Sequence, residues 1–483
     1  MSVKRHIYLW HRYLGIALCL LIAMWFASGI VLMYVGYPSL DDEARLAGLP
    51  PLEADMELVS PGAVVERYGD VDALRLNAAP GRPAYHVRQG GEWHSVDAAT
   101  GAPLTLEDMD VQAAARRHAG AEVAALEPVE VDQWTVPGRF NAHRPLVRAR
   151  MDDDAVSWLY LSSSTGEVVQ TTTRFERGWN WVGAVVHWIY PWQLRQHPEL
   201  WRQFVIWLCV PAIALIITGT LVGIWRLRVR RRYKGGRMTP YRGWHRWHHI
   251  LGIACVVFVF TFMVSGLLSM NPGRVFTSPA PDREQTATWE DGPLITEAVV
   301  PPAALLANAP DGVRELEWDR QAGAPLVHLH GADTSRVRRA DGSPFEPDAD
   351  TLTARAEGLV SEGSITETTR LTDYDYYYYY ARRSHRPLPV LRLRFDDPDG
   401  TTLYINPETA AIESRIDHSG RWRRWLYNGL HSLDFPVLWE RRPLWDVVVL
   451  SLSLAGLAFS LTGAVIGWKR LVGRVRVKRR RLR

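Results

Sequence analysis

Two pairs among the 16 histidines of this 483-residue chain occupy matching positions in repeated blocks of sequence. The block Trp-His-Arg-Tyr-Leu-Gly-Ile-Ala around His11 aligns with Trp-His-His-Ile-Leu-Gly-Ile-Ala around His248, and a second pair of blocks aligns His187 with His431. Equivalent residues of an internal repeat face each other across the axis that relates the two copies. Two facing neutral imidazoles can occupy both axial positions of a haem iron. We therefore expect two haem b groups, one bound by His11 and His248 and the other by His187 and His431.

Small residues accompany both histidine pairs. Gly15 and Gly252 lie four residues after His11 and His248, on the same helix face, where they leave room for a flat porphyrin. Close packing between membrane helices also favours small residues, and the two explanations are compatible. Serine–glycine or threonine–glycine pairs occur near both expected depths, at Ser28-Gly29, Ser265-Gly266, Thr218-Gly219 and Thr462-Gly463.

Three other histidines compete for these sites. His245 and His249 lie close to His248, but only His248 preserves the register of the repeated Leu-Gly-Ile-Ala sequence. His248 is therefore the preferred inner ligand, and the other two remain alternatives. His197 lies near the expected outer pair, but Arg441 stands at the equivalent position of the second half. We therefore leave His197 out of the expected ligand set.

Four long stretches of the chain lack Asp, Glu, Lys and Arg, and about 20 apolar residues are enough to span a bilayer as a helix. We therefore expect an integral membrane protein with four transmembrane helices. The first stretch is too long for a cleaved signal peptide and no small-x-small site follows it, which indicates a signal anchor. The stretches lie between Arg12 and Asp41, Arg202 and Arg226, Arg246 and Arg274, and Asp446 and Lys469.

The distribution of charge predicts the topology. Residues 226–246 and 469–483 contain many Lys and Arg and no acidic residue. Positive segments beside membrane helices stay in the cytoplasm, so both termini and the 226–246 loop are expected there, with the two long intervening segments outside. Basic runs directly beside apolar helices indicate contact with anionic membrane lipid, so no nucleic-acid partner is expected.

The two outside segments alternate short strand patterns with turns. Residues 83–88 and 325–330 each precede an Asp- or Gly-containing turn, and residues 158–160 and 403–405 form later strand patterns. Residues 111–117 are predicted to be helical. Each outside segment is therefore expected to form a small α+β module with two related sheet units.

These motifs resemble a known family. A strand followed by Asp-Ala-x-Thr-Gly (residues 97–101), or containing Tyr-x-Asn-Pro-x-Thr (residues 404–409), resembles PepSY modules. Helices that open with His-x-x-x-Gly and contain Ser/Thr-Gly resemble the PepSY-associated transmembrane family, which includes bacterial inner-membrane ferric-siderophore reductases that bind haem. The resemblance covers nearly the whole chain. It implies a multi-pass protein of the bacterial inner (cytoplasmic) membrane, and an oxidoreductase that reduces a ferric siderophore or another ferric chelate in the periplasm through catalytic residues that remain unknown.

The expected fold is a membrane α-helical protein with four transmembrane helices, an internal duplication and two extracytoplasmic α+β PepSY-like domains. Each half of the duplication contributes a helix, an outside domain, a short interfacial helix and a second helix. The predicted boundaries are 1–36 for the cytoplasmic start and transmembrane helix 1, 37–174 for the first periplasmic domain, 175–226 for an interfacial helix and transmembrane helix 2, 227–246 for a basic cytoplasmic loop, 247–271 for transmembrane helix 3, 272–418 for the second periplasmic domain, 419–468 for an interfacial helix and transmembrane helix 4, and 469–483 for a basic cytoplasmic tail.

The expected reaction carries electrons outwards across the membrane. No Gly-x-Gly-x-x-Gly fingerprint opens a strand-turn-helix unit, and the cytoplasmic segments are too short for a flavin domain, so the electron donor is expected to be a separate cytoplasmic reductase or a quinol. The alternative is a PepSY-domain membrane protein that binds or regulates without catalysis. Spans without charged residues disfavour coupled transport. The absence of Cys-x-x-Cys-His excludes covalently attached haem, and no Walker loop or zinc-ligand spacing is present.

A run of tyrosines, Tyr374 and Tyr376–Tyr380, is the remaining unusual feature. Tyrosine favours strands, so one interpretation is a packed strand. The other is an aromatic platform for an iron chelate. Nearby cationic side chains that would attract an anionic chelate are Arg382, Arg383, His385 and Arg386.

Overall fold

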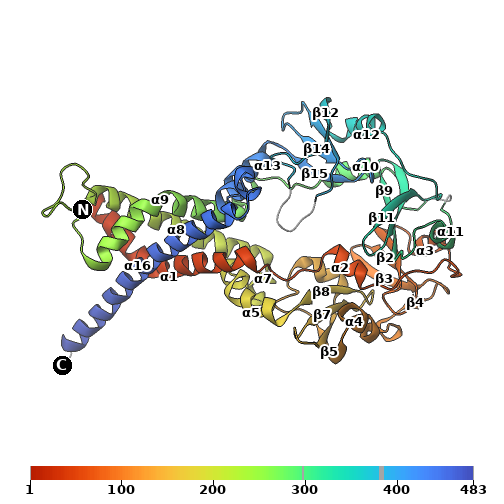
Figure 1. Ribbon diagram of the computed structural model, residues 1–483, viewed down its shortest axis with the longest axis horizontal. Helices are drawn as coiled ribbons and strands as arrows, with labels where there is room; N and C mark the ends of the chain where they lie inside the picture. The colour runs from red at the N-terminus through yellow and green to blue at the C-terminus, as the bar shows by residue number, and fades with distance from the viewer. Residues whose placement is uncertain (1, 296–298, 380–385, 482–483) are drawn as a thin grey trace. The chain divides into compact units, whose positions relative to one another are not determined.

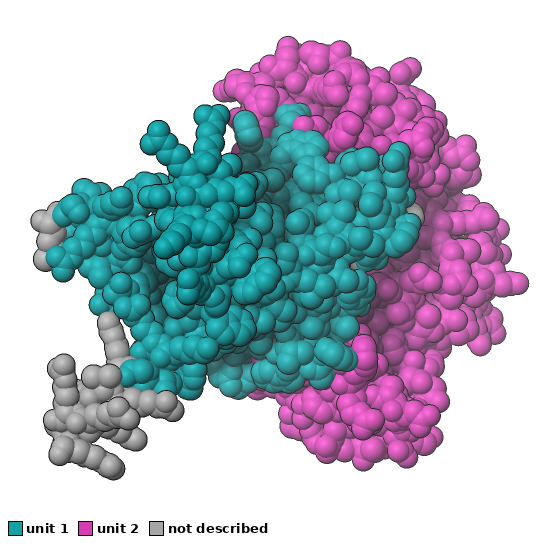
Figure 2. All heavy atoms as spheres, turned by 60° about the vertical axis from the view of Figure 1, so that its left-hand side comes forward, with its two compact units in different colours: residues 1–37, 178–276, 421–483 teal, residues 38–177, 277–420 magenta. Residues whose placement is uncertain are grey.

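The computed structural model describes residues 2–295, 299–379 and 386–481, and the chain divides into two compact units (Figures 1 and 2). One unit consists of residues 1–37, 178–276 and 421–483 and is called the helical unit below. The other consists of residues 38–177 and 277–420 and is called the sheet unit. Each unit therefore draws on both halves of the sequence.

Four long helices build the helical unit (Figure 1). Each is long and apolar enough to cross a membrane, as the uncharged stretches predict. Contacts between them run from α1 to α8, from α8 to α9, from α9 to α16 and from α16 back to α1, so α1 and α9 lie on one diagonal of the bundle. Their bounds are Val3–Tyr34 for α1, Pro198–Arg226 for α8, Gly243–Ser269 for α9 and Leu444–Arg481 for α16.

Two of these helices extend beyond their predicted ends. Helix α9 begins at Gly243, inside the predicted 227–246 loop. Helix α16 continues to Arg481 through the predicted 469–483 tail. Arginine and lysine are good helix formers, and the tail contains no proline to stop the helix. The apolar pattern marks where a helix is able to cross lipid, and the helix itself runs further.

Short helices precede α8 and α16 in the chain. Helix α6 packs against α1, and helix α14 packs against α9, so each short helix reaches the far end of a long one. Before α8 stand α5 (Arg174–Val182), α6 (Ala184–His187) and α7 (Trp192–Arg195). Before α16 stand α13 (His418–Arg423), a π-helical turn (Arg424–Gly429), α14 (Leu430–Ser432) and α15 (Pro436–Trp439).

The described residues of the sheet unit form three antiparallel sheets. The largest has seven strands in the order β11-β10-β9-β1-β2-β3-β4. Its strands are β1 (Ala73–Asn77), β2 (Ala84–Gln89), β3 (Glu92–Asp97), β4 (Pro103–Leu104), β9 (Glu315–Gln321), β10 (Ala324–His330) and β11 (Ser335–Arg339). The two four-stranded sheets comprise β5 (Glu122–Val129), β6 (Leu146–Asp152), β7 (Trp158–Ser162) and β8 (Val168–Thr172), and β12 (Ile365–Leu371), β13 (Val390–Phe395), β14 (Thr402–Ile405) and β15 (Ile412–Ile416). The main helices of this unit are α2 (Asp42–Ala47), α3 (Pro61–Tyr68), α4 (Val111–Ala119), α10 (Arg283–Glu290), α11 (Pro302–Ala307) and α12 (Ala349–Ala356).

The seven-stranded sheet differs from the expected pair of separate outside domains. Strand β1 from residues 37–174 pairs with β9 from residues 272–418, so both segments contribute to one sheet. An unpaired edge strand exposes a row of backbone donors and acceptors, and this pairing removes one such edge from each segment. In the β1–β9 ladder Arg75 lies opposite Glu317. Leu74 lies opposite Trp318 on one side of this pair, and Leu76 lies opposite Leu316 on the other, so Arg75 and Glu317 occupy symmetric places in the sheet.

Alternation along these strands gives the sheet two different faces. One face is apolar and packs against α3 and α11. Its buried residues include Leu74, Leu76, Leu316 and Trp318, with Val64 and Leu305 from the covering helices. The opposite face carries polar side chains, among them Arg75, Asn77, His86, Glu315 and Glu317.

The tyrosine run does not form a strand within its described residues. Asp375 accepts hydrogen bonds from the backbone N–H groups of Tyr377 and Tyr378 at 2.8 and 2.6 Å, which folds the segment into a turn. Tyr378 is buried and stacks on Tyr404 with ring centres 4.8 Å apart. The strand interpretation is therefore wrong, because a side-chain carboxylate replaces the ladder partner that the backbone would need. Tyr380, Arg382, Arg383 and His385 lie outside the described residues.

Candidate functional site

The outer histidine pair lies where α6 and α14 pack against the ends of α1 and α9. The rings of His187 and His431 face each other with centres 6.1 Å apart. His187 Nδ1 lies 3.1 Å from the carbonyl oxygen of Trp25, and His431 Nδ1 lies 3.3 Å from that of Phe262. Because a carbonyl oxygen only accepts hydrogen bonds, each Nδ1 carries the proton and donates it.

Two serines reinforce this arrangement. Ser28 Oγ lies 3.2 Å from His187 Nδ1 and donates to Trp25 O at 3.1 Å. Ser265 Oγ lies 3.1 Å from His431 Nδ1 and donates to the equivalent carbonyl at 3.0 Å. Each serine proton is used on a carbonyl, so its oxygen is left to accept from the imidazole. The Ser-Gly pairs noted in the sequence therefore orient the outer histidines.

The inner histidine pair lies near the starts of α1 and α9, on the diagonal of the bundle. The rings of His11 and His248 have centres 6.2 Å apart. His11 Nδ1 lies 3.4 Å from the carbonyl oxygen of Leu215, and His248 Nδ1 lies 2.9 Å from Thr462 Oγ1. Thr462 donates its own proton to the carbonyl of Phe459 at 2.6 Å, so its oxygen accepts from His248. Both inner imidazoles thus carry the proton on Nδ1.

All four imidazoles therefore present an Nε2 lone pair, which is the form of histidine that ligates a metal. A metal–imidazole bond is about 2 Å long, so two imidazoles on opposite sides of one iron have ring centres roughly 6.3 Å apart. The observed separations of 6.1 and 6.2 Å match that spacing at both ends of the bundle. The four residues fit two bis-histidine haem sites.

Glycines lie directly against each imidazole. A Cβ atom added at Gly219 would lie 2.7 Å from His11 Cε1, and one at Gly463 would lie 3.1 Å from His248 Cε1. The corresponding distances to Cε1 are 3.2 Å from Gly29 to His187 and 3.5 Å from Gly266 to His431. Larger residues at these positions would push the rings away, so these glycines set where the imidazoles lie.

A cavity of about 420 Å³ surrounds the inner pair. Gly15 and Gly252 line its apolar walls, as the i, i+4 spacing from the histidines predicts. Arg12, Tyr241 and Arg470 also line it. Apolar walls with cationic and phenolic groups suit a flat, largely apolar ligand that carries anionic substituents.

The competing histidines occupy different environments. His249 Nε2 lies 2.9 Å from the carbonyl oxygen of Gly223, so this nitrogen carries the proton and donates it. Its Nδ1 lies 2.8 Å from Thr239 Oγ1. His245 is exposed at the edge of the cavity, and His197 is exposed at the N-cap of α8. The geometry therefore favours His248 among the three inner candidates.

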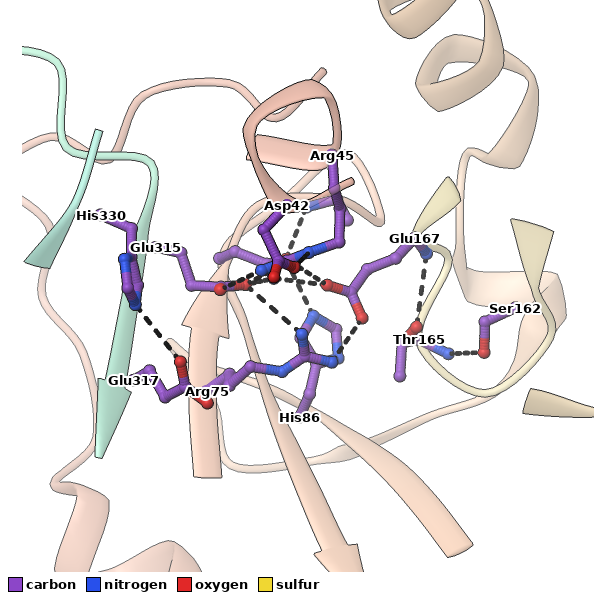
Figure 3. A network of polar contacts seen from close by, with 12 residues as sticks. Asp42, Arg45, Arg75, His86, Ser162, Thr165, Glu167, Glu315, Glu317 and His330 are labelled. Carbon is purple, nitrogen blue, oxygen red and sulfur yellow. Dashed lines mark hydrogen bonds and ion pairs between the residues drawn. The ribbon is translucent and has the colours of Figure 1, made fainter. Parts of the chain in front are cut away.

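The sheet unit also contains a buried polar network that the sequence did not predict (Figure 3). Arg45 of α2 donates to Glu315 of β9 at 2.8 and 3.0 Å and to Glu167 at 3.2 Å. Arg75 of β1 donates to Glu167 at 2.9 Å. Burial by itself raises the pKa of both carboxyl groups, but the two arginines outweigh it and hold each pKa below its usual value. The network joins segments that are distant in sequence, so no local motif could reveal it.

His86 belongs to the same network. Its Nε2 lies 2.9 Å from Asn77 Oδ1, and its Nδ1 lies 2.7 Å from Ser95 Oγ. Burial lowers the pKa of His86 to about 4. Both ring nitrogens therefore have protein partners, so His86 is a structural residue of the network.

This arrangement defines a helical membrane protein in which paired histidines lie at both ends of a bundle of long helices. The chain belongs to the PepSY-associated transmembrane family: a family model described as the PepSY-associated TM region matches residues 8–355. The resemblance inferred from the sequence motifs is thus confirmed at the level of the family. A comparison with curated proteins finds no significant match.

Proposed function

We propose that this protein is a di-haem transmembrane electron-transfer protein that reduces a periplasmic acceptor, namely a ferric siderophore or another ferric chelate. The observation that carries the proposal is the shared geometry of the four histidines. Each pair has ring centres just over 6 Å apart, and every Nδ1 is fixed by an acceptor so that Nε2 is available. In this proposal His11 and His248 hold one haem b, and His187 and His431 hold the other.

The internal duplication predicted from the sequence supports this assignment. The contact between Gly29 and His187 recurs between Gly266 and His431. The contact between Gly219 and His11 likewise recurs with Gly463 and His248. A haem bound by two equivalent histidines would be held by two copies of one repeated segment, related by an axis along the membrane normal.

The two sites lie at opposite ends of the same helices. From His11 to Ser28, which contacts His187, α1 advances about 25 Å at the helical rise of 1.5 Å per residue. That distance covers most of the roughly 30 Å hydrocarbon core of a bilayer. A haem held by a pair of these histidines would supply one-electron transfer at each end of the bundle.

The protein residues supply orientation, exclusion of water and charge balance. Backbone carbonyls and hydroxyl groups hold each imidazole in one tautomer, and the buried side chains between the sites, such as Ile22, Phe26 and Val259, keep water out of the bundle. In this proposal one electron enters from a separate cytoplasmic reductase or a quinol and leaves to Fe³⁺ in the chelate, which becomes Fe²⁺. Arg12 and Arg470 at the inner cavity would neutralise anionic haem substituents.

Charge supports the proposed orientation in the membrane. The basic segments 226–246 and 469–483, together with the N-terminus, would lie in the cytoplasm of a bacterium, and the sheet unit would lie in the periplasm. The outer histidine pair would then be the one from which the periplasmic acceptor is reduced.

A haem-to-protein ratio and a dithionite-reduced minus oxidised spectrum test the proposal directly. We expect b-type bands and two haems per chain. His187→Ala and His431→Ala should each remove the same haem, so the double variant should lose no more than either single one. His11→Ala and His248→Ala should behave alike for the other haem. His197→Ala and His245→Ala are the matched controls at the two ends and should keep both.

Two outcomes would contradict the proposal. A colourless purified protein would favour the alternative, a PepSY-domain protein that binds or regulates without catalysis. A full haem complement in His187→Ala and His431→Ala would show that these residues are not ligands. Reoxidation of the dithionite-reduced protein by a ferric chelate, followed by its haem bands, tests the acceptor separately.

A further inference from the structure

A second group of metal-ligand side chains lies on the polar face of the seven-stranded sheet. His328 and His330 alternate along β10, so both side chains project from one face. Glu317 and Asp319 alternate along the neighbouring strand β9, and Glu317 is directly opposite His328 in the register. Two imidazoles and two carboxylates thus meet on adjacent strands.

Each imidazole has its Nε2 close to a carboxylate oxygen. His330 Nε2 lies 3.2 Å from Glu317 Oε2, and Figure 3 draws this contact as a dashed line. His328 Nε2 lies 3.3 Å from Asp319 Oδ2. The two rings are stacked with centres 5.8 Å apart and planes only 13° from parallel. Two imidazole–carboxylate pairs therefore lie side by side on neighbouring strands.

Neighbouring residues hold these groups in place. His330 Nδ1 lies 3.1 Å from Ser335 Oγ on β11, and this contact fixes the ring with Nε2 towards Glu317. Gln321 donates to Asp319 Oδ2 at 3.0 Å. Contacts of this kind to the far side of a ligand are typical of metal sites.

The group is partly open to solvent on its carboxylate side. The side chains of His328 and His330 are 14% and 19% exposed, whereas that of Glu317 is 41% exposed. Ligand atoms of Glu315, Glu317 and His330 all lie within 4.8 Å of one another. Glu315, however, is fully buried and neutralised by Arg45, so it supports the site from behind.

We propose that His328, His330 and Glu317, with Asp319 beside them, bind a divalent first-row transition metal ion such as Zn²⁺ or Fe²⁺. Imidazole with carboxylate is a donor set that suits these ions, whereas Ca²⁺ and Mg²⁺ prefer oxygen ligands alone. Two histidines spaced i, i+2 on a strand can reach one ion from the same face, and a carboxylate across the ladder supplies a third ligand. This proposal concerns the sheet unit and is independent of haem binding by the helical unit.

The first half of the chain offers a natural control for this site. In the β1–β2 ladder Arg75 lies opposite His86, just as Glu317 lies opposite His328 in the β9–β10 ladder. Exposed Arg88 stands two residues after His86, as His330 does after His328. There His86 keeps the histidine, but Arg75 and Arg88 replace Glu317 and His330, so the first half should bind no cation.

Calorimetric titration of the full chain in detergent, stripped of metal by a chelator, tests the proposal with Zn²⁺ as the probe. We expect the wild-type protein and Arg88→Ala to bind one more Zn²⁺ per chain than His328→Ala/His330→Ala. Glu317→Gln should weaken binding at that site about tenfold. Mg²⁺ at the same concentrations should not compete.

Two results would overturn the proposal: equal Zn²⁺ stoichiometry in all four proteins, or displacement of Zn²⁺ by Mg²⁺. The single variant His330→Gln keeps a polar side chain of similar reach and guards against unfolding as the cause of lost binding. Thermal unfolding and the haem spectrum of each variant provide the folding control, because neither should change if only the sheet site is lost. Failure of the haem proposal would leave this measurement valid.

Discussion

Gly29 lies against His187 and Gly266 lies against His431, whereas Arg75 and Glu317, which occupy symmetric places in the seven-stranded sheet, carry opposite charges. At these glycine–histidine contacts of the helical unit, corresponding positions of the two halves keep the same residue types. In the central sheet, corresponding positions keep the same backbone register and change their chemistry.

The two smaller sheets show that this divergence is local. Tyr160 donates to Asp132 at 2.6 Å in one, and Tyr404 donates to Asp375 at 3.0 Å in the other. We expect equivalent positions to keep the same residue where both halves contribute to one binding site or form the same turn. A strand ladder needs only its backbone and its apolar face to match, so the side chains of its polar face are able to acquire separate roles in each half.

The largest expected effect tests the divergent sheet. Glu315→Ala removes a fully buried carboxylate that holds Arg45 and Asn77, and leaves a buried guanidinium with less compensation. We expect a loss of about 3–5 kcal/mol in unfolding free energy. Glu367→Ala, which removes a partly exposed partner of Arg392 and Arg394, should cost much less, because solvent screens these pairs. Equal shifts in the thermal unfolding of the two variants would contradict this ranking.

The pH dependence of stability is a second test of the buried network in the central sheet. Burial lowers the pKa of His86 to about 4, while an unfolded histidine has a pKa of about 6.5. Between these values the unfolded state binds a proton that the folded state does not, so stability is highest above pH 6.5 and falls as the pH falls towards 4. The contribution of His86 amounts to roughly 3 kcal/mol across that interval. His86→Gln should flatten the decrease in unfolding temperature, and an unchanged slope would refute the assignment.

The matched glycines test whether the two halves of the helical unit are equivalent. Gly219→Leu and Gly463→Leu would each force an inner imidazole away from its position, because a Cβ atom alone would come within 2.7 or 3.1 Å of the ring. We expect each variant to lower the affinity for the inner haem at least about tenfold, or 1.4 kcal/mol, and to spare the outer one. Gly178→Ala adds a Cβ where nothing lies within 4 Å and should keep both haems. Loss of the inner haem from only one of the two leucine variants would show that the two halves are not equivalent.

The smallest effect concerns the acceptor of His248. Thr462→Val removes the hydroxyl that fixes its Nδ1, so the inner haem should bind a few-fold to about tenfold more weakly. Ser28→Ala should have less effect, because the carbonyl of Trp25 still accepts from His187. Haem titration of the two variants in parallel compares them, and equal losses would mean that the carbonyl does not suffice.

Much of the helical unit could be predicted from sequence because its signals are local or repeated. Uncharged stretches predict the four long helices, and repeated blocks bring His187 and His431 together although they are far apart in the chain. The choice of His248 over His249 also follows from the repeat register, and the acceptors of their ring nitrogens agree with it.

The sheet unit was less predictable, because its decisive contacts are long-range. Nothing near Glu167 or Glu315 indicates that both meet Arg45, and a strand pattern does not state that β1 pairs with β9. The prediction for the tyrosine run was wrong for a different reason, because a local contact overrode a local propensity. Strand propensity was strong there, but one carboxylate, Asp375, bends the backbone into a turn.

Three of the four paired imidazoles rest on main-chain oxygens, those of Leu215, Trp25 and Phe262. A point mutation replaces a side chain and leaves the peptide carbonyl in the helix. Substitutions in the surrounding helices therefore leave the tautomer of these three histidines unchanged. The basicity of the ligands stays the same while neighbouring side chains vary.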